Sequence, residues 1–235
     1  MELNQAKVLV TGGTQGIGYE IAKQMKTQGA QVVICGRNGE RLAKVAKELS
    51  VIGIQADVSK ESDVIHLVQE AHKKMGGLNV LINNAAYGYF SVLTEMNTKK
   101  FNELLATNLT GAMMVGRECA KIFVSENSGN IINISSTAGN SGYASGTAYC
   151  ATKFALKGMT ECWRQELRKH NVRVMLVNPS EVQTEFMPNS GSPQRTMNET
   201  KLEAEEIAHL IVSMLTMRNR GFITEATVFA TNPQG

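Results

Sequence analysis

Short runs of continuously apolar residues recur along the chain, separated by longer stretches with the periodicity of an α-helix. A run that is apolar at every position and rich in β-branched residues is typical of a strand covered on both faces. We expect strands at Lys7–Val10, Gln31–Cys35, Val51–Gln55, Val80–Ile82, Asn130–Ile134, Arg173–Val177 and Thr224–Phe229. The helical patterns lie at residues 16–28, 39–49, 61–75, 97–124, 147–170 and 201–217.

Alternation of strands and helices favours a parallel sheet between two layers of helices. Because crossover connections in such sheets are right-handed, the simplest topology is a doubly wound α/β fold with seven parallel strands. The chain has 235 residues. This length suits a single domain over residues 1–235.

One polar segment interrupts the alternation. Residues 188–196 are rich in Pro, Gly, Ser and Asn and follow the sixth expected strand. Long loops inside compact domains are usually lids or disordered segments. We therefore expect a substrate lid over residues 186–200, with an idle loop as the alternative. The next helix has Thr200 and Glu203 at the spacing of a capping box.

Composition and charge argue against several classes of protein. Lys and Arg number 24 and Asp and Glu 21, a net charge of +3 with no dense basic cluster, so no nucleic-acid partner is expected. No apolar run approaches the ~20 residues of a membrane span, and the first residues lack the parts of a signal peptide. The four cysteines form no Cys-x-x-Cys pair and no zinc spacing. We expect reduced, mostly buried thiols, no metal and a cytoplasmic protein; a redox role for Cys150 is the weaker alternative.

A glycine-rich turn, Thr11–Gly18, joins the first expected strand to the first helix. Small residues let backbone N–H groups approach a pyrophosphate, and the helix N-terminus attracts its charge. The spacing Gly12-x3-Gly16-x-Gly18 differs from the commoner G-x-G-x-x-G, and a turn that merely lets a helix pack closely is the alternative. Its place after the first strand favours a dinucleotide site.

The end of the second strand indicates which dinucleotide is preferred. A carboxylate there holds a free ribose 2′-hydroxyl, whereas an arginine suits a 2′-phosphate. Here the strand runs out through Arg37 and Asn38, with no acid before Glu40. The guanidinium of Arg37 would hold the phosphate as a planar, permanently charged fork, although an arginine at a solvated helix start is the alternative. We therefore expect NADPH in preference to NADH.

Tyr149 and Lys153 lie four residues apart in a helical pattern and so share one face. A nearby ammonium lowers the pKa of a phenol from about 10, which would let Tyr149 exchange a proton with a carbonyl oxygen. Ser136 ends the fifth strand, at the sheet edge where ligands bind, and offers a hydroxyl to a substrate oxygen. Asn108 is a poor residue for a helix interior, which suggests a water-relay site.

Together these motifs resemble the short-chain dehydrogenase/reductase family, in its compact single-domain branch with a Rossmann fold. The matching residues are Thr11–Gly18, Asp57-Val58, Asn83-Asn84-Ala85, Asn108, Ser136, Tyr149-x3-Lys153, Asn178-Pro179, Val182 and Thr184. The resemblance implies reversible reduction of a ketone or aldehyde, with Tyr149 as acid/base and Lys153 lowering its pKa. It implies that Ser136 holds the substrate carbonyl and that Asn108 anchors a water. The implied cofactor residues are Gly12, Thr14, Gln15, Gly16, Ile17, Gly18, Arg37, Asp57, Val58, Asn84, Ala85, Ala86, Tyr149, Lys153, Val182 and Thr184.

Three positions depart from the family pattern. Ala86 stands where the family usually has Gly, and Gln15 stands where many NADPH-preferring relatives carry Lys or Arg. The usual Asn-Pro-Gly reads Asn178-Pro179-Ser180 and is followed by Glu181. The methyl group of Ala86 would narrow one wall of the cofactor site, and Gln15 weakens the argument for NADPH. The altered turn at Ser180 and Glu181 weakens any inference of the substrate from relatives that have the usual turn.

Aromatic residues near these motifs suggest an apolar substrate pocket formed by Tyr87, Tyr89, Tyr143 and Phe186, although each also suits a core position. They favour a ketone or aldehyde with apolar bulk; carrier-protein ketoreductases share only the family motifs. The alternatives are a non-catalytic NADP(H)-binding regulator, an NAD-dependent alcohol dehydrogenase and a nucleotide-sugar epimerase or dehydratase. By analogy with relatives, helices 97–124 and 147–170 would pair in a homodimer or homotetramer.

Overall fold

The computed structural model describes residues 1–186 and 198–234. Its centre is one sheet in the order β3-β2-β1-β4-β5-β6-β7, in which every neighbouring pair is parallel. The strands are β1 (Lys7–Thr11), β2 (Gln31–Gly36), β3 (Ile52–Gln55), β4 (Val80–Asn83), β5 (Gly129–Ile134), β6 (Val172–Pro179) and β7 (Glu225–Val228). The strand order reverses between β1 and β4, which is where doubly wound sheets open a crevice.

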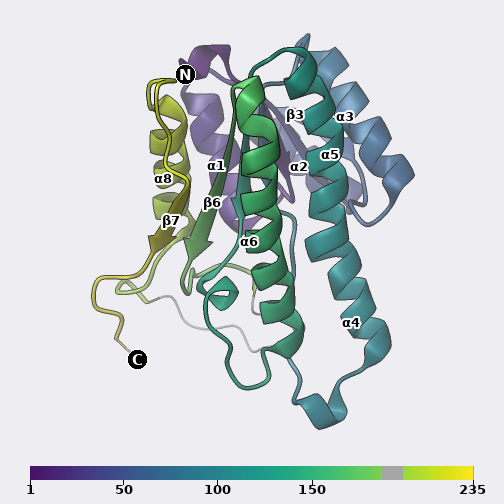
Figure 1. The fold of residues 1–235 in the computed structure, drawn as a ribbon, viewed down its shortest axis with the longest axis vertical. Coiled ribbons are helices and arrows are strands. Elements are labelled where there is room, and N and C mark those ends of the chain that lie inside the picture. Colours follow the sequence, from purple (N-terminus) through teal and green to yellow (C-terminus); the bar gives the residue numbers. More distant parts are fainter. Residues whose placement is uncertain (187–197, 235) are drawn as a thin grey trace.

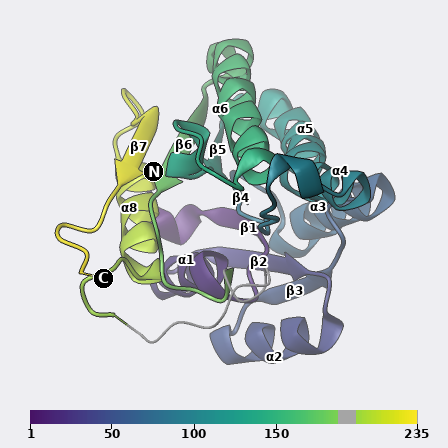
Figure 2. The ribbon, with the colours of Figure 1, turned by 90° about the horizontal axis from the view of Figure 1, so that it is seen from below.

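Helices cover both faces of this sheet (Figures 1 and 2). Helices α1, α2 and α8 pack on one face, and α3, α5 and α6 pack on the other. Their bounds, with that of α4, are α1 (Gly16–Thr27), α2 (Gly39–Leu49), α3 (Glu61–Met75), α4 (Thr98–Leu105), α5 (Ala112–Ser125), α6 (Thr147–Leu167) and α8 (Ala204–Thr216). The three-layer, doubly wound fold expected from the sequence is confirmed.

The two-sided burial of the sheet explains why its strands are continuously apolar. In β1, Val8 and Val10 pack into the core under α1 and α8, while Leu9 between them packs into the core under α3 and α5. All three are fully buried. Successive side chains of a strand point to opposite faces, so a strand covered on both faces needs an apolar residue at every position.

The stretch expected to form one helix over residues 97–124 is instead three segments. Helix α4 ends at Leu105, a π-helical turn occupies Ala106–Gly111, and α5 begins at Ala112. Single π-turns inside helices are frequent at functional sites. The wider turn contains Asn108, whose side chain bonds to backbone outside the helix.

The cap of α8 lies one turn later than expected. Glu203, and not Thr200, is the N-cap, and the side chain of Glu206 accepts a hydrogen bond from the backbone N–H of Glu203 at 2.7 Å. The hydroxyl of Thr200 instead donates to the side chain of Asn198 at 2.7 Å. The capping box is present, but two glutamates form it.

In the ranges that the structure describes, no helix combines the length and the apolar composition that crossing a membrane requires. All four cysteines are free thiols, and three of them are buried while Cys162 is exposed. The expectation of unpaired, mostly buried thiols is confirmed.

Candidate active site

A cavity of about 970 Å³ opens at the carboxyl ends of the strands, the lower end of the molecule in Figure 1. Most of the residues expected around a cofactor and a substrate line it together. They are Gly12, Thr14, Gln15, Gly16, Ile17, Arg37, Asp57, Val58, Asn84, Ala85, Ala86, Ser136, Tyr149, Lys153, Val182 and Thr184. Of the expected catalytic and cofactor residues, Gly18 and Asn108 do not line it.

The glycine-rich turn is locked against the end of β4. The side-chain amide of Asn84 donates to the carbonyl oxygens of Thr11 and Gly12, at 3.0 and 3.1 Å. The hydroxyl of Thr11 accepts from the backbone N–H groups of Asn84 and Ala85, both at 3.0 Å. Gly12 has a φ of +64°. A Cβ there would lie 2.9 Å from the Cα of Ala85, so the turn needs glycine for both its conformation and its space.

Gly18 serves packing rather than cofactor contact. It lies in α1, and a Cβ on it would come within 2.4 Å of the carbonyl oxygen of Gly12 and of the side-chain nitrogen of Asn84. The absent side chain lets α1 begin directly beneath the turn. The N-terminus of α1 therefore points its free N–H groups at the cavity, an arrangement suited to a pyrophosphate.

The corner of the cavity beyond β2 is cationic. Arg37 and Arg41 line it, and the guanidinium of Arg41 donates to the side-chain oxygen of Gln15. Asp57 lies on the neighbouring wall. Burial raises the pKa of its carboxyl, but hydrogen bonds from Ser59 and the charge of Arg37 outweigh burial and bring that pKa below its ordinary value.

Tyr149 lies in α6 between two aromatic rings. Its ring centroid is 5.8 Å from that of Phe90 and 5.4 Å from that of Phe186. Burial raises the pKa of the phenol, while a hydrogen bond with Ser136 acts in the opposite direction. The hydroxyl of Ser136 also accepts a hydrogen bond from the backbone N–H of Ala138 at 3.1 Å. This bond orients the serine side chain just beyond the carboxyl end of β5.

Lys153 lies one turn after Tyr149 on the same face of α6, as the spacing predicted. Its ammonium is 5.6 Å from the centroid of the Tyr149 ring and donates to the carbonyl oxygen of Ile134 at 2.8 Å. Burial lowers the pKa of Lys153 to about 8. The net direction for the Tyr149 pKa is upward, not downward as expected from a neighbouring ammonium, because burial is the largest influence on the phenol.

Asn108 holds backbone rather than lining the cavity. Its side-chain oxygen accepts from the N–H of Tyr87 at 3.1 Å, and its side-chain nitrogen donates to the carbonyl oxygen of Tyr87 at 2.8 Å. The side chain is 2% exposed. This pair of hydrogen bonds joins the π-helical turn to the segment after β4, which forms one wall of the cavity.

Three of the four residues expected in the substrate pocket line the cavity: Tyr87, Tyr143 and Phe186. Tyr89 does not; its hydroxyl accepts from the backbone N–H of Asn97 at 2.9 Å and its ring lies under the ammonium of Lys100. Its outward position follows from this contact at the start of α4. Phe90 lines the cavity in its place. Cys150 is buried but is not part of the lining.

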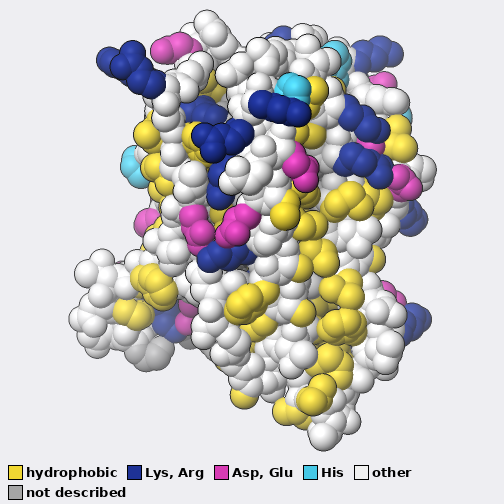
Figure 3. All heavy atoms as spheres, viewed as in Figure 1, with side chains coloured by type: hydrophobic (Ala, Val, Ile, Leu, Met, Phe, Trp, Pro, Cys, Tyr) yellow, Lys and Arg dark blue, Asp and Glu magenta, His cyan; other side chains and the backbone are white. Residues whose placement is uncertain are grey.

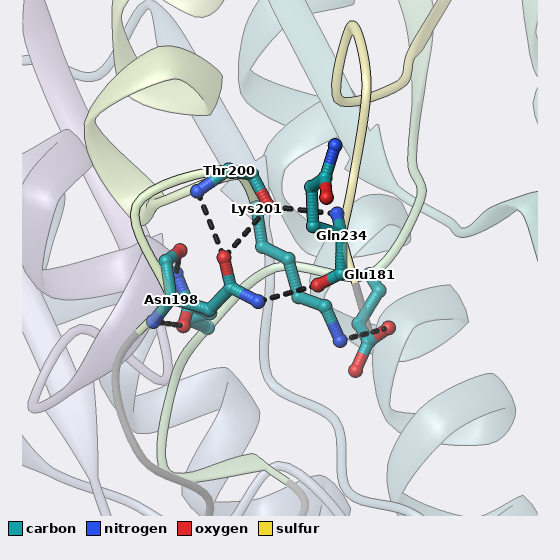
Figure 4. Close-up of polar contacts among 6 residues, drawn as sticks. Glu181, Asn198, Thr200, Lys201 and Gln234 are labelled. Atoms are coloured by element: carbon teal, nitrogen blue, oxygen red, sulfur yellow. Dashed lines mark hydrogen bonds and ion pairs between the residues drawn. The ribbon is translucent and has the colours of Figure 1, made fainter.

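The segment after β6 lines the cavity. Polar contacts join this segment to residues 198–201, and residues 198 and 200 to Gln234 (Figure 4). Gln183 and Asn198 exchange two hydrogen bonds of 2.7 Å, and Asn198 donates to the carbonyl oxygen of Gln234 at 2.6 Å. Lys201 forms an ion pair with Glu181 at 3.4 Å. The expected lid over residues 186–200 lies mostly outside the described residues, since only its ends, 186 and 198–200, are described.

A family model described as short chain dehydrogenase matches residues 6–195. The chain belongs to the short-chain dehydrogenase/reductase family. It is 33% identical to the NADP-dependent 3-hydroxy acid dehydrogenase of Schizosaccharomyces pombe, an alignment that covers 99% of this chain and 95% of the relative.

Two solved structures are similar over nearly the whole chain. The closed form of a serine dehydrogenase complexed with NADP⁺ is 27% identical with a TM-score of 0.87, and the match covers 94% of this chain and 93% of that one. A metagenomic short-chain oxidoreductase in complex with NADP is 30% identical with a TM-score of 0.84, over 97% and 99% of the two chains.

Beneath the site of this short-chain dehydrogenase/reductase lies a buried polar chain that sequence reasoning missed. Asn83 donates to Asn133 at 3.0 Å and to the carbonyl oxygen of Ala112 at 3.1 Å, and Asn133 donates to Thr160 at 2.8 Å. These hydrogen-bonded side chains link β4 and β5 to α5 and to α6, the helix that carries Tyr149. Asparagine inside otherwise apolar strands was the available signal, since a buried amide needs partners.

The described ranges, 1–186 and 198–234, hold no group of three or more His, Cys, Asp or Glu side chains placed to bind a metal ion. The side chains that line the cavity include the phenol of Tyr149, the hydroxyl of Ser136, the ammonium of Lys153 and the guanidiniums of Arg37 and Arg41, together with the carboxylates of Asp57, Glu181 and Glu185. The phenol, the hydroxyl and the cations suit an anionic cofactor and proton exchange with an oxygen atom of a substrate.

Proposed function

We propose that this short-chain dehydrogenase/reductase reduces a ketone or aldehyde to an alcohol with NADPH, reversibly, through Ser136, Tyr149 and Lys153. One observation carries the proposal. The phenol, the hydroxyl and the ammonium line the same cavity as the glycine-rich turn and the cationic corner after β2. A proton donor and a dinucleotide cradle in one cavity are what hydride transfer to a carbonyl requires.

The residues present fit a dinucleotide with a 2′-phosphate. The turn at Gly12 leaves backbone free of side chains, and the end of β2 offers Arg37 with no carboxylate before Glu40. The relatives described above act with or bind NADP, according to their names. These observations support NADPH over NADH as the cofactor of this chain.

Bound NADPH would supply the hydride from its nicotinamide, and the protein would supply the proton and the positioning. Ser136 would donate a hydrogen bond to the carbonyl oxygen of the substrate, and Tyr149 would transfer its proton to that oxygen as charge develops there. Lys153 has three N–H donors, of which Ile134 accepts one. The others are available to ribose hydroxyls, and the cation would stabilise the phenolate left behind.

The substrate end of the cavity is mainly aromatic. Phe90 and Phe186 flank Tyr149, and Tyr87 and Tyr143 line the walls nearby. Such walls favour a neutral carbonyl compound with apolar bulk. The substrate is therefore proposed to be a ketone or aldehyde with apolar bulk rather than a small charged acid.

An assembly of two or four subunits is part of the proposal. Apolar side chains gather over the face of α5 and α6 (Figure 3), where Phe154 of α6 is 47% exposed. Large apolar side chains on a helix face are typical of subunit interfaces. We propose that this face pairs with its counterpart in a homodimer or homotetramer.

A turnover assay separates the proposed reaction from its alternatives. The protein would be incubated with NADPH or NADH and a panel of ketones, aldehydes and diketones, and nicotinamide absorbance would be followed. The proposal requires loss of absorbance faster with NADPH than with NADH. A regulator would bind NADPH, measured by calorimetry, without turnover on any compound, and an NAD-dependent alcohol dehydrogenase would show the reverse preference. Either result contradicts the proposal.

A further inference from the structure

The loop that follows Ser136 is attached to α6 at two successive turns of the helix. At the first turn, a Cβ on Gly139 would lie 3.0 Å from the backbone carbonyl oxygen of Lys153, so the loop packs directly on the helix. At the second turn, the ammonium of Lys157 donates to the side-chain oxygen of Asn140 at 2.8 Å. These contacts hold the serine against the helix that carries the phenol, and both groups must reach one substrate oxygen.

Lys157 is held in turn by strands β6 and β7. Its ammonium forms an ion pair with the carboxylate of Glu225 in β7 at 3.2 Å. The same oxygen atom of Glu225 accepts from the side-chain amide of Asn178 in β6 at 2.7 Å. A series of polar contacts therefore runs from β6 through β7 and α6 to the loop after Ser136.

Asn178 holds Glu225 at a cost in stability. The Asn178 side chain is fully buried, and its oxygen has no hydrogen-bond partner within residues 1–186 and 198–234. Its nitrogen also donates to the hydroxyl of Thr227, at the longer distance of 3.4 Å. A buried amide with one polar atom unpaired stabilises a fold less than an apolar side chain would, and such departures are concentrated at functional sites.

The ion pair between Lys157 and Glu225 adds little to the stability of the fold. Both side chains are 32% exposed. Solvent screens charges in such positions, and pairs of this kind have a small or no measurable effect on unfolding. Lys157 is also not among the described residues that line the cavity, so it does not act on a substrate directly. Its contacts instead fix the loop through Asn140.

We propose that Lys157, itself held by Glu225, is a positioning residue that fixes Ser136 relative to Tyr149. The inference rests on the proposed reduction of a carbonyl group by these last two residues. Without the bond to Asn140 the loop can shift away from α6, and the serine hydroxyl then lies at the wrong distance from the substrate oxygen. Lys157 therefore acts on kcat through the loop, and the glycine-rich turn that would hold the cofactor is unaffected.

Variants on both sides of the contact test the proposal, assayed with a ketone or aldehyde that the wild type reduces. Lys157→Met removes the donor and keeps an unbranched side chain. We expect kcat to fall about tenfold and the calorimetric Kd for NADPH to change less than about twofold. Lys157→Arg keeps a charged donor for both acceptors and should restore most of the lost kcat. Asn140→Ala removes the acceptor on the loop and should match Lys157→Met. Lys23→Met is the control: it removes an exposed lysine that is ion-paired with glutamates of α1 and α8, and should leave kcat unchanged.

A cycle of double variants shows whether Lys157 acts through the serine. Ser136→Ala alone should lower kcat, because it removes the donor to the substrate oxygen. In the Ser136→Ala protein, Lys157→Met should lower kcat less than about twofold further, because no hydroxyl is left to position. Fully additive losses would assign Lys157 to the fold at large and overturn the proposal.

A second cycle tests the role of the carboxylate. Glu225→Gln keeps an acceptor for Asn178 and removes the charge that holds Lys157, so it should lower kcat about threefold. Added to Lys157→Met, the same change should lower kcat less than about twofold further. Additive losses would overturn the part of the proposal that concerns Glu225.

Wild-type turnover in Lys157→Met or in Asn140→Ala would overturn the proposal for Lys157. A loss that arginine does not restore, or that comes with an equal loss of NADPH affinity, would overturn it as well. Failure of the proposed function has a different signature, because wild-type turnover in Ser136→Ala would contradict the role of the serine itself, whatever the result for Lys157→Met.

Discussion

At the scale of single residues, Lys153 stands out as a buried ammonium with a backbone carbonyl as its hydrogen-bond partner. It is 3% exposed, and the described residues give it no ion pair with a carboxylate. Burial lowers its pKa from 10.5 to about 8, so the protein stabilises the charged form less well than water does. The buried charge does not serve stability, which agrees with the proposed role of Lys153 beside Tyr149.

Replacing this ammonium should therefore stabilise the fold while removing activity. The pKa change corresponds to a penalty of about 3 kcal/mol at pH 7, from which the lost hydrogen bond to Ile134, about 1 kcal/mol, must be subtracted. Lys153→Met is expected to have a free energy of unfolding, measured in urea, about 2 kcal/mol higher than that of the wild type. It is also expected to lose turnover. A destabilised Lys153→Met protein would contradict this account of the charge.

The pH dependence of that difference has a definite sign. Between pH 8 and 10.5 the unfolded chain keeps the Lys153 proton that the folded protein has released, so wild-type stability gains relative to Lys153→Met as pH rises. The advantage of Lys153→Met should be full below pH 8 and shrink toward pH 10. Comparing the two proteins cancels the titration of other buried groups, and an advantage that does not change with pH would refute the assignment.

Residues recognised by a motif were predictable, and residues defined by a distant partner were not. The spacing of Tyr149 and Lys153 placed both on one helix face because α6 is regular there. Tyr89 was misplaced because its partner, the backbone of Asn97, follows from the path of the chain into α4. The upward direction of the Tyr149 pKa depends on burial by Phe90 and Phe186, which only the folded structure brings together.

At the scale of elements, the π-helical turn at Ala106–Gly111 joins the helical layer to the cavity wall through Asn108. The periodicity of residues 97–124 predicted one helix, because a single wide turn leaves the pattern on either side intact. The poor helix propensity of Asn108 was the one sequence signal of the irregularity. Its contact with the backbone of Tyr87 required the structure.

Removing the Asn108 side chain should loosen that wall. Asn108→Ala leaves the N–H and the carbonyl of Tyr87 without their partners, so we expect a loss of about 1–3 kcal/mol in the free energy of unfolding and a lower kcat. Urea unfolding and turnover measure the two effects. Asn102→Ala, an exposed asparagine of α4, is the matched control. If Asn108→Ala and Asn102→Ala had the same free energy of unfolding and the same kcat, the contact with Tyr87 would contribute to neither stability nor turnover.

At the scale of the whole molecule, the order of strands and helices followed from apolar periodicity because the sheet is buried on both faces. Assembly does not follow in the same way, since an apolar helix face is equally compatible with a core and an interface until the fold shows which side is exposed. The fold leaves Phe154 of α6 at the surface, on the face proposed to pair.

A charge at this position should break the assembly. Phe154→Lys is expected to shift the mass measured by light scattering at micromolar concentration from a dimer or tetramer toward a monomer, because an unpaired ammonium in an apolar interface is costly. Ile65→Lys, on α3, is the control and should leave the mass unchanged; Ile65 is 37% exposed and Phe154 47%. A monomeric wild type would rule out the proposed assembly.

The central claim is that the phenol of Tyr149 exchanges a proton with a substrate bound beside a dinucleotide. The most direct measurement is turnover and NADPH affinity of Tyr149→Phe, which removes one oxygen atom and keeps the ring between Phe90 and Phe186. We expect kcat to fall by about 10²–10⁴, the contribution of a positioned general acid, with the calorimetric Kd for NADPH nearly unchanged. Near-normal turnover in Tyr149→Phe would contradict the account.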